Sequence, residues 1–224
     1  MTYITLSYHL ENDSPVHKGL VQPQILPKSQ ITDGEYYNSY LIHVENHSGT
    51  HVDAPGHFLN EGKKIGDYYP EELIYHNPLI LDCPKMDNEL VTIPDLENIE
   101  LSGVDCLFFK TGFGKYRASN RERYLTQNPG VSPELVGWIR KEYPKIRGLG
   151  IDAISLSRFQ NVKSGIEAHL NAFNKEEYGG PPLLLIEDLN LTVLENPHQV
   201  KKIILVPWQL KEVDSAPCTV LARI

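Results

Sequence analysis

The sequence predicts a strand-rich α/β protein that folds as a single domain over residues 1–224. Three observations support this prediction. Short apolar segments rich in β-branched residues recur along the chain, each bounded by Pro, Gly, Asp or Asn, as is typical of strands. Helical signals are fewer. The chain contains no repeat, low-complexity stretch or long linker that would divide it, and its length suffices for one substantial core.

The predicted strands are short segments at residues 3–10, 40–44, 79–81, 107–110, 148–151, 183–186, 203–206 and 219–222. A helix is predicted after Ser132, because this N-cap residue precedes Pro133 at the first helical position and apolar residues follow at helical spacing. A shorter helix is expected over residues 70–75. The polar segment 114–130 is expected to be an excursion or a lid-like loop.

The composition argues against several classes of function. The formal net charge is -8 and no cluster of Lys and Arg stands out, which argues against nucleic acid as a partner. No apolar run approaches the roughly 20 residues that a membrane span needs, and no basic segment leads into an apolar stretch at the N-terminus. The cysteines, which are Cys83, Cys106 and Cys218, are odd in number and widely spaced. We therefore expect a cytoplasmic protein with reduced thiols.

Four of the nine histidines fall within fifteen residues of one another: His43, His47, His51 and His57. Asp53 lies among them, and imidazole and carboxylate groups are ligands that a divalent transition metal binds at roughly 2.0–2.2 Å. A single histidine needs no such explanation, but four with an aspartate and suitably placed glycines favour a metal site. His43 is the expected bystander, because it lies on a predicted strand before the other three.

The spacing of these residues requires the chain to bend. His47 and His51 are four residues apart, but the glycine and β-branched residues around them disfavour a helix. In a straight strand they would lie roughly 13 Å apart, too far for two ligands of one ion. Residues 48–49, Ser-Gly, allow a bend. His51 and Asp53 then share one face of an extended segment, and the following Pro-Gly offers a turn that can return His57.

Residues 47–58 resemble the signature of the so-called cyclase family, H-x-G-T-H-x-D-A-P-x-H-F, and match it at every fixed position. That family includes bacterial kynurenine formamidases and isatin hydrolases. The resemblance extends more weakly along most of the chain, through the Thr-Gly after residues 107–110, the Gly-Ile-Asp stretch at 150–155 and the Asp-Ser-Ala-Pro at 214–217.

The resemblance implies a swivelling β/β/α-type fold, a homodimer or larger homo-oligomer, and hydrolysis of an amide bond. It also implies one or two divalent metals per chain, zinc or manganese. Carried over by position, six residues would bind metal: His47, His51 and Asp53 the first ion, and His57, His169 and Glu187 a second one. His57 would also be the catalytic base.

Glu187 has support of its own, because it ends a wholly apolar run and a carboxylate buried there needs a partner such as a metal. His169 depends on the resemblance. Asp152 also follows an apolar strand, where such a residue more often caps the following turn. The sequence contains no Gly-x-Ser-x-Gly elbow and no cysteine beside a histidine, so serine or cysteine nucleophiles lack local support.

We therefore expect a metal-dependent amidohydrolase that cleaves a small-molecule amide, N-formyl or cyclic, with a metal-activated water. His57 would be the general base. The metal would hold the oxyanion, with the Thr50 hydroxyl or a backbone N–H as a candidate second donor. Two alternatives stay open. One is a hydrolase that opens a lactone or lactam ring at the same site, and the other is a metal-binding protein without turnover.

Two departures from the family pattern concern the substrate. Residues 14–19 lack an aromatic residue that family members often carry there, and residues 171–180 are an expected insertion. We expect segments 114–130 and 171–180 to wall the pocket instead, through Tyr116, Arg117, Arg121, Phe173 or Tyr178. On this basis N-formylkynurenine is expected to be a poor substrate.

Overall fold

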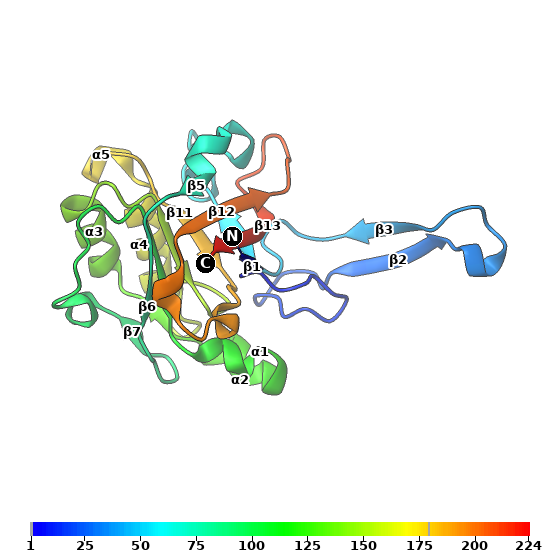
Figure 1. Cartoon of the computed structure of the whole chain (residues 1–224), viewed down its shortest axis with the longest axis horizontal. Helices are drawn as coiled ribbons and strands as arrows, with labels where there is room; N and C mark the ends of the chain where they lie inside the picture. Colours follow the sequence, from blue (N-terminus) through cyan, green and yellow to red (C-terminus); the bar gives the residue numbers. More distant parts are fainter. Residues whose placement is uncertain (1, 179) are drawn as a thin grey trace.

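The computed structural model describes residues 2–178 and 180–224, and a mixed sheet lies at its centre (Figure 1). The strands of this sheet are β1 (Tyr3–Thr5), β4 (His51–Asp53), β5 (Ile74–Tyr75), β6 (Pro78–Asp82), β8 (Cys106–Lys110), β10 (Gly148–Ile151), β11 (Leu184–Glu187), β12 (Lys202–Pro207) and β13 (Ser215–Arg223). Their order is β5-β12-β13-β4-β11-β10-β8-β6, and β1 pairs with β13 beside this path.

The sheet curls until it is nearly closed. β5 and β6 lie at opposite ends of the strand order, yet only His76 and Asn77 separate them in the chain. The strands from β6 to β11 are parallel, whereas those from β11 through β4, β13 and β12 to β5 pair antiparallel. The predicted α/β class is confirmed as a mixed, barrel-like sheet with helices. The swivelling β/β/α arrangement stays a prediction.

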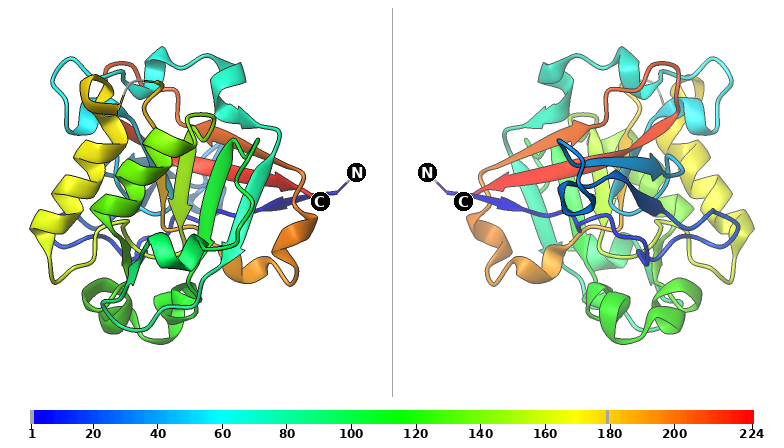
Figure 2. Two further views of the ribbon diagram at one scale, coloured as in Figure 1. Left: turned by 90° about the vertical axis from the view of Figure 1, so that its left-hand side faces the viewer. Right: turned by 90° about the vertical axis from the view of Figure 1, so that its right-hand side faces the viewer.

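Two longer helices, α3 (Pro133–Glu142) and α4 (Val162–Phe173), lie side by side over the parallel strands (Figure 2). Alternation along β8 separates the two cores: Leu107 and Phe109 pack with the helices, whereas Cys106 and Phe108 pack inside the curled sheet. Among the described residues no helix is long and apolar enough to cross a membrane. The shorter elements are α1 (Tyr116–Ser119), α2 (Arg121–Thr126), α5 (Lys175–Tyr178) and the parallel pair β7 (Leu90–Val91) and β9 (Gly130–Val131).

Each of the eight predicted strand segments overlaps an observed strand, and residues 148–151 match β10 at both ends. The helix predicted after Ser132 is α3, and the Ser132 hydroxyl accepts a hydrogen bond from the backbone N–H of Leu135 at 3.1 Å. The short helix predicted over residues 70–75 is wrong in part, because a 3-10 turn there leads into β5. The loop predicted over residues 114–130 is also wrong, since α1 and α2 occupy it. No prediction covers α4, whose sequence contains the weak helix former Gly165.

The strands β2 (Gln24–Ser29) and β3 (Ser39–His43) form a hairpin that projects far from the body (Figure 1). We call residues 24–43 the arm. Seven of its large apolar side chains are between 42% and 98% exposed: Leu26, Ile31, Tyr36, Tyr37, Tyr40, Leu41 and Ile42. A two-stranded hairpin with nothing packed on its faces is only marginally stable in water, so this surface is suited to being covered.

The fold makes a prediction about Phe108, which lies fully inside the curled sheet. Phe108→Ala is expected to lower the free energy of unfolding by about 3–5 kcal/mol, because it removes buried contacts and leaves a cavity. Val206→Ala on β12, where the side chain is 47% exposed, is the control and should cost under about 1 kcal/mol. Urea unfolding of both variants measures the difference, and equal losses would contradict the described packing.

Candidate metal centre

A bend before β4 brings His47 back towards that strand. Gly49 at the bend has a φ of +65°, in the left-handed region that glycine adopts without strain, as the sequence predicts. Val52 packs inside the curled sheet, so His51 and Asp53 share the opposite face of β4, on the side that the helices cover. The bend and the strand together place three potential ligands within a short stretch of chain.

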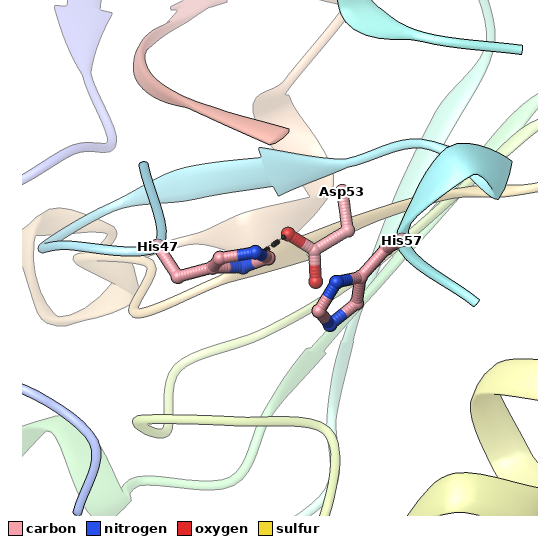
Figure 3. A group of neighbouring side chains, drawn as sticks. All are labelled: His47, Asp53 and His57. Carbon is pink, nitrogen blue, oxygen red and sulfur yellow. Dashed lines mark ion pairs between the residues drawn. The ribbon is translucent and has the colours of Figure 1, made fainter. Parts of the chain in front are cut away.

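A 3-10 turn at Pro55–His57 then returns His57 to the same place. The ring centroids of His47 and His57 are 4.2 Å apart, and His47 Nδ1 lies 3.0 Å from Asp53 Oδ1. Figure 3 shows the two imidazoles on either side of the Asp53 carboxylate. The predicted return of His57 through the Pro-Gly turn is therefore confirmed.

The remaining candidates come from β11 and α4. The antiparallel register of β4 and β11 sets His51 opposite Glu187, and His51 Nε2 lies 3.5 Å from Glu187 Oε2. His169 reaches the other oxygen of this carboxylate from α4, with Nε2 at 3.5 Å from Oε1. All six residues that the sequence analysis proposed as ligands therefore line one pocket.

Two of the histidines have their tautomers set by backbone carbonyls. His51 Nδ1 lies 2.8 Å from the carbonyl oxygen of Gly49, and His169 Nδ1 lies 2.8 Å from that of Gly165. A carbonyl oxygen can only accept, so each Nδ1 is the donor and carries a hydrogen. In the neutral imidazole the Nε2 lone pair is then free and directed at the carboxylates. This is the usual orientation of a metal-binding histidine.

The donor atoms group into two sets whose members lie within 4.8 Å of one another: His47, Asp53 and His57, and His51, Asp53 and Glu187. Asp53 belongs to both sets and could bridge two ions. This grouping differs from the one implied by the resemblance, which assigns His51 with His47 and assigns His57 with Glu187. The individual ligand roles stay predictions.

Asp53 provides the test of whether these residues fit a cation. Its side chain is 1% exposed, and its Oδ1 has no hydrogen-bond partner among the described residues. Two imidazole nitrogens approach this oxygen outside hydrogen-bond geometry, His47 Nδ1 at 3.0 Å and His51 Nε2 at 3.5 Å. A buried carboxylate oxygen without a well-formed hydrogen bond is costly, and a divalent cation would satisfy it. The residues present therefore fit a bound metal.

Asp214 is the functional residue that the sequence analysis missed. His57 Nδ1 donates to Asp214 Oδ2 at 2.7 Å, and His47 Nε2 lies 3.1 Å from the same oxygen. Asn46 Nδ2 donates to Oδ1 at 2.8 Å. The sequence signal for Asp214 is the Asp-Ser-Ala-Pro motif at residues 214–217, before the last strand. This motif is part of the family resemblance, but no role was predicted for its aspartate.

The carboxylates and histidines shift one another's pKa values. Burial alone lowers the pKa of His47, but the carboxylates of Asp214 and Asp53 outweigh it and raise that pKa to about 10. Burial raises the pKa of Glu187, yet the contact with His169 and nearby positive charge lower it to about 2. Hydrogen bonds from two histidines hold the pKa of Asp214 well below its usual range. At neutral pH Glu187 and Asp214 are therefore ionised, as Glu187 must be to bind a metal.

The hydroxyl of Thr50, beside these residues, already forms hydrogen bonds to groups outside the cluster. It donates to the Asp188 carbonyl at 2.5 Å and accepts from the Tyr8 N–H at 3.0 Å. The Asp188 carboxylate in turn accepts from Arg117 Nε at 2.8 Å and from the Tyr124 hydroxyl at 2.5 Å. The expectation that the Thr50 hydroxyl holds an oxyanion is therefore wrong, because that hydroxyl belongs to a buried network behind the site.

Two further residues have the structural roles that the sequence favoured. His43 lies on the arm, outside the cluster. Asp152 accepts hydrogen bonds from the Thr111 N–H at 2.8 Å, the Thr111 hydroxyl at 2.5 Å and the Gly112 N–H at 2.9 Å. It thus caps a turn, but the turn follows the neighbouring strand β8 rather than its own.

The pocket beside the cluster has a volume of about 450 Å³, and its walls differ from those that the sequence predicted. None of the five residues proposed to wall it lines it: Tyr116, Arg117, Arg121, Phe173 and Tyr178. Arg117 pairs with Asp188 behind the site, and Phe173 is buried in the core. The walls include Phe58 and Phe159. The expectation that N-formylkynurenine is a poor substrate loses its premise, since aromatic surface is present.

Comparison with known proteins identifies the relatives of this chain. Residues 4–158 match the family described as "putative cyclase". A kynurenine formamidase from Geobacillus thermodenitrificans strain NG80-2 is 27% identical over 170 residues, which cover 75% of this chain and 77% of that protein. An uncharacterized protein of Haemophilus influenzae is 32% identical over 117 residues, which cover 51% of this chain and 82% of its own length.

Solved structures share the fold. Isatin hydrolase A from Labrenzia aggregata, bound to benzyl benzoate, aligns with a TM-score of 0.80 at 20% identity and covers 99% of this chain and 93% of its own. A structure described as a potential metal-dependent hydrolase with cyclase activity aligns with a TM-score of 0.76 at 22% identity, covering 99% and 96%. The family match spans more than half of the sequence and includes the clustered histidines, so this chain belongs to the cyclase family.

Proposed function

We propose that this protein is a metal-dependent amidohydrolase that cleaves a small amide, N-formyl or cyclic, with His57 as the general base. One observation carries the proposal: the Nε2 atoms of His51 and His169 are directed at the buried carboxylates of Asp53 and Glu187. The similarity to a kynurenine formamidase and the fold shared with isatin hydrolase A support an amide as the substrate.

The metal would be zinc or manganese, one or two ions per chain, because nitrogen and carboxylate oxygen ligands suit both. The residues that would hold it are His47, His51, Asp53, His57, His169 and Glu187. When bound, such a metal supplies a water nucleophile at neutral pH, since it lowers the pKa of water from 15.7 to about 7.

His57 is placed to move protons. Its Nδ1 donates to Asp214 Oδ2 at 2.7 Å, so its Nε2 carries the lone pair, and the ring lines the pocket. Nε2 can accept the proton of the attacking water and return it to the departing nitrogen. Asp214 holds the imidazole in this tautomer and stabilises its protonated form, as the aspartate of a Ser-His-Asp triad does.

We further propose that the protein is a homodimer in which the arm packs against a second copy of the chain. The seven exposed apolar residues of the arm support this assembly, because their surface has no partner within the described residues of one chain. In a twofold dimer each arm would cover the same patch on its partner, so a single surface would satisfy both copies.

The first prediction concerns metal content. His51→Ala is expected to lose most of the bound metal and stay folded, because it removes a ligand from a strand whose core side chain is Val52. His43→Ala, on the arm, is the matched control and should keep the wild-type content. Elemental analysis after dialysis and circular dichroism measure both properties. Full metal occupancy in the His51→Ala protein would refute the assignment.

The second prediction separates base from ligand at His57. His57→Ala is expected to keep at least one metal per chain and to lower kcat by about 10²–10⁴-fold on a formanilide substrate, since a general base is lost. Asp214→Asn should lower kcat in the same direction. Chelation should abolish hydrolysis by the wild type. A His57→Ala enzyme with the wild-type rate and metal content would remove this residue from the site.

The third prediction concerns the proton that His47 releases when metal binds. The pKa of His47 is about 10, above its ordinary value of about 6.5, so the folded metal-free protein holds this proton at pH 8. A metal ligand must be deprotonated, and metal binding at pH 8 should therefore release about one proton from His47. The stability that this proton contributes to the metal-free protein is complete below pH 6.5 and is lost as the pH rises through about 10.

Calorimetric titration of the metal-free protein with zinc chloride, in two pH 8 buffers of different ionisation enthalpy, counts the protons released. The apparent enthalpy should differ between the buffers, and His47→Gln should reduce the difference by about one proton. A binding enthalpy that is independent of the buffer would contradict this prediction.

The fourth prediction tests the assembly. The triple change of Tyr36, Tyr37 and Tyr40 to Ser is expected to convert a dimer into a monomer, because it removes three exposed aromatic rings of the arm. Tyr69→Ser, at a residue of the body that is 73% exposed, is the control and should stay dimeric. Light scattering behind size-exclusion chromatography measures the mass. A wild-type protein that is monomeric at micromolar concentration would overturn this proposal.

A further inference from the structure

Asp188, the residue after the candidate ligand Glu187, has a backbone conformation that few side chains adopt. Its φ is +53°, in the left-handed region, and its side chain is fully buried. Aspartate and asparagine tolerate this region better than most residues, but the conformation still costs free energy unless the surrounding contacts hold it. The contacts of Asp188 therefore hold the chain in a strained position directly beside the metal centre.

The backbone of Asp188 connects three segments that surround the centre. Its N–H donates to the Ala153 carbonyl at 2.8 Å, at the start of the segment that hydrogen-bonds to the Glu187 carboxylate. Its carbonyl accepts from the Thr50 hydroxyl at 2.5 Å, and Thr50 directly precedes His51 on β4. A shift of Asp188 would therefore move the backbone on which Glu187 and His51 are carried.

The carboxylate of Asp188 is anchored by side chains of α1 and α2. Arg117 donates from Nε to Oδ1 at 2.8 Å and from Nη2 to Oδ2 at 2.8 Å, which makes a bidentate pair. The Tyr124 hydroxyl also donates to Oδ1, at 2.5 Å. The guanidinium lies over the ring of Tyr8, 3.9 Å from its centroid. Side-chain exposure is 12% for Arg117 and 0% for Asp188, so this ion pair lies inside the protein.

A buried ion pair of this kind adds little to the stability of a fold. The cost of removing two charges from water offsets most of their attraction, and apolar residues of similar size often stabilise a protein as well. The pair does supply direction, since a planar guanidinium and a carboxylate fix each other's orientation through two parallel hydrogen bonds. Directional anchoring matters where atoms must stay within about 0.5 Å of one geometry, as metal ligands must.

We infer that Asp188 and Arg117 are positioning residues that set the affinity of the centre for its metal, by fixing the backbone that carries Glu187 and His51. Both act from behind the site, because the described residues that line the pocket include neither of them. The inference rests on the metal-binding part of the proposed function. It does not depend on amide hydrolysis or on any particular substrate.

The test removes both charges together, with Arg117→Met and Asp188→Asn in one protein. The single change Arg117→Met would leave an unpaired carboxylate whose charge attracts a cation, whereas the double change keeps the net charge. Asparagine also tolerates the left-handed conformation. The double variant is expected to bind zinc about 10-fold more weakly than the wild type, as loss of support behind a metal ligand typically causes. Titration of the metal-free proteins with zinc chloride against a chelating dye measures the affinity.

Two controls separate positioning from stability. Arg123→Met with Asp87→Asn removes an ion pair of the same kind from the surface, where Arg123 Nη2 lies 2.7 Å from Asp87 Oδ1, and should keep the wild-type affinity. Phe108→Ala should lower the urea midpoint of unfolding and also keep the affinity, because its cavity lies inside the curled sheet. If the Arg117 pair were merely structural, zinc affinity would be unchanged in every variant that is folded.

Arg117→Lys is a milder variant that retains the buried charge and loses the planar fork. It should fold and bind zinc with an affinity between those of the wild type and the double variant. Wild-type affinity in the folded double variant, or in Arg117→Lys, would overturn the positioning role and leave the metal centre intact. A wild-type protein that does not bind zinc would instead overturn the metal centre, and this inference with it.

Discussion

The buried carboxylate of Asp53 is the feature around which the rest of the site is arranged. A carboxylate removed from water needs compensation, and Asp53 Oδ1 has no hydrogen bond among the described residues although His47 Nδ1 lies 3.0 Å away. Glu187 is a second buried carboxylate, 5% exposed at the end of β11, although its Oε1 accepts two hydrogen bonds. Two carboxylates so close together inside a protein repel each other unless positive charge stands between them. The surrounding histidines reduce this cost in the metal-free protein, and a divalent cation would remove most of it.

The side chains around this charge are held by hydrogen bonds to groups that cannot move far. Backbone carbonyls of Gly49 and Gly165 orient the rings of His51 and His169. Glu187 Oε1 accepts from the Ser155 hydroxyl at 2.9 Å and from the Leu156 N–H at 2.7 Å. Because these partners belong to strands, tight turns and a helix, the donor atoms keep their positions without a metal. Such preorganisation is what a metal site or a catalytic site requires.

The two ends of the pocket would have different roles: the inner end would carry out the reaction, and the outer part would select the substrate. Its inner end carries the residues of the motif that defines the family, and these would perform any hydrolysis. Its outer part comes from residues 17–20 and 154–159 and from the start of α4, which lie outside that motif. Substitutions in the outer walls can therefore alter which molecule binds without displacing the histidines and carboxylates.

The sequence by itself determined the parts of this site whose geometry is local. Residues 47–58 predicted a bend at Gly49, a shared face for His51 and Asp53, and a turn that returns His57, because glycine conformation and strand alternation act over a few residues. The apolar strands were predictable for the same reason. Tertiary structure alone decided that Asp214 orients His57, since these residues are 157 positions apart in the chain. It also decided the register of β4 against β11, for which the sequence made no prediction, and the walls of the pocket, for which the prediction was wrong. Pairing and wall positions depend on how the sheet curls and where α4 packs, and these long-range contacts leave little periodic signal in the short segments that make them.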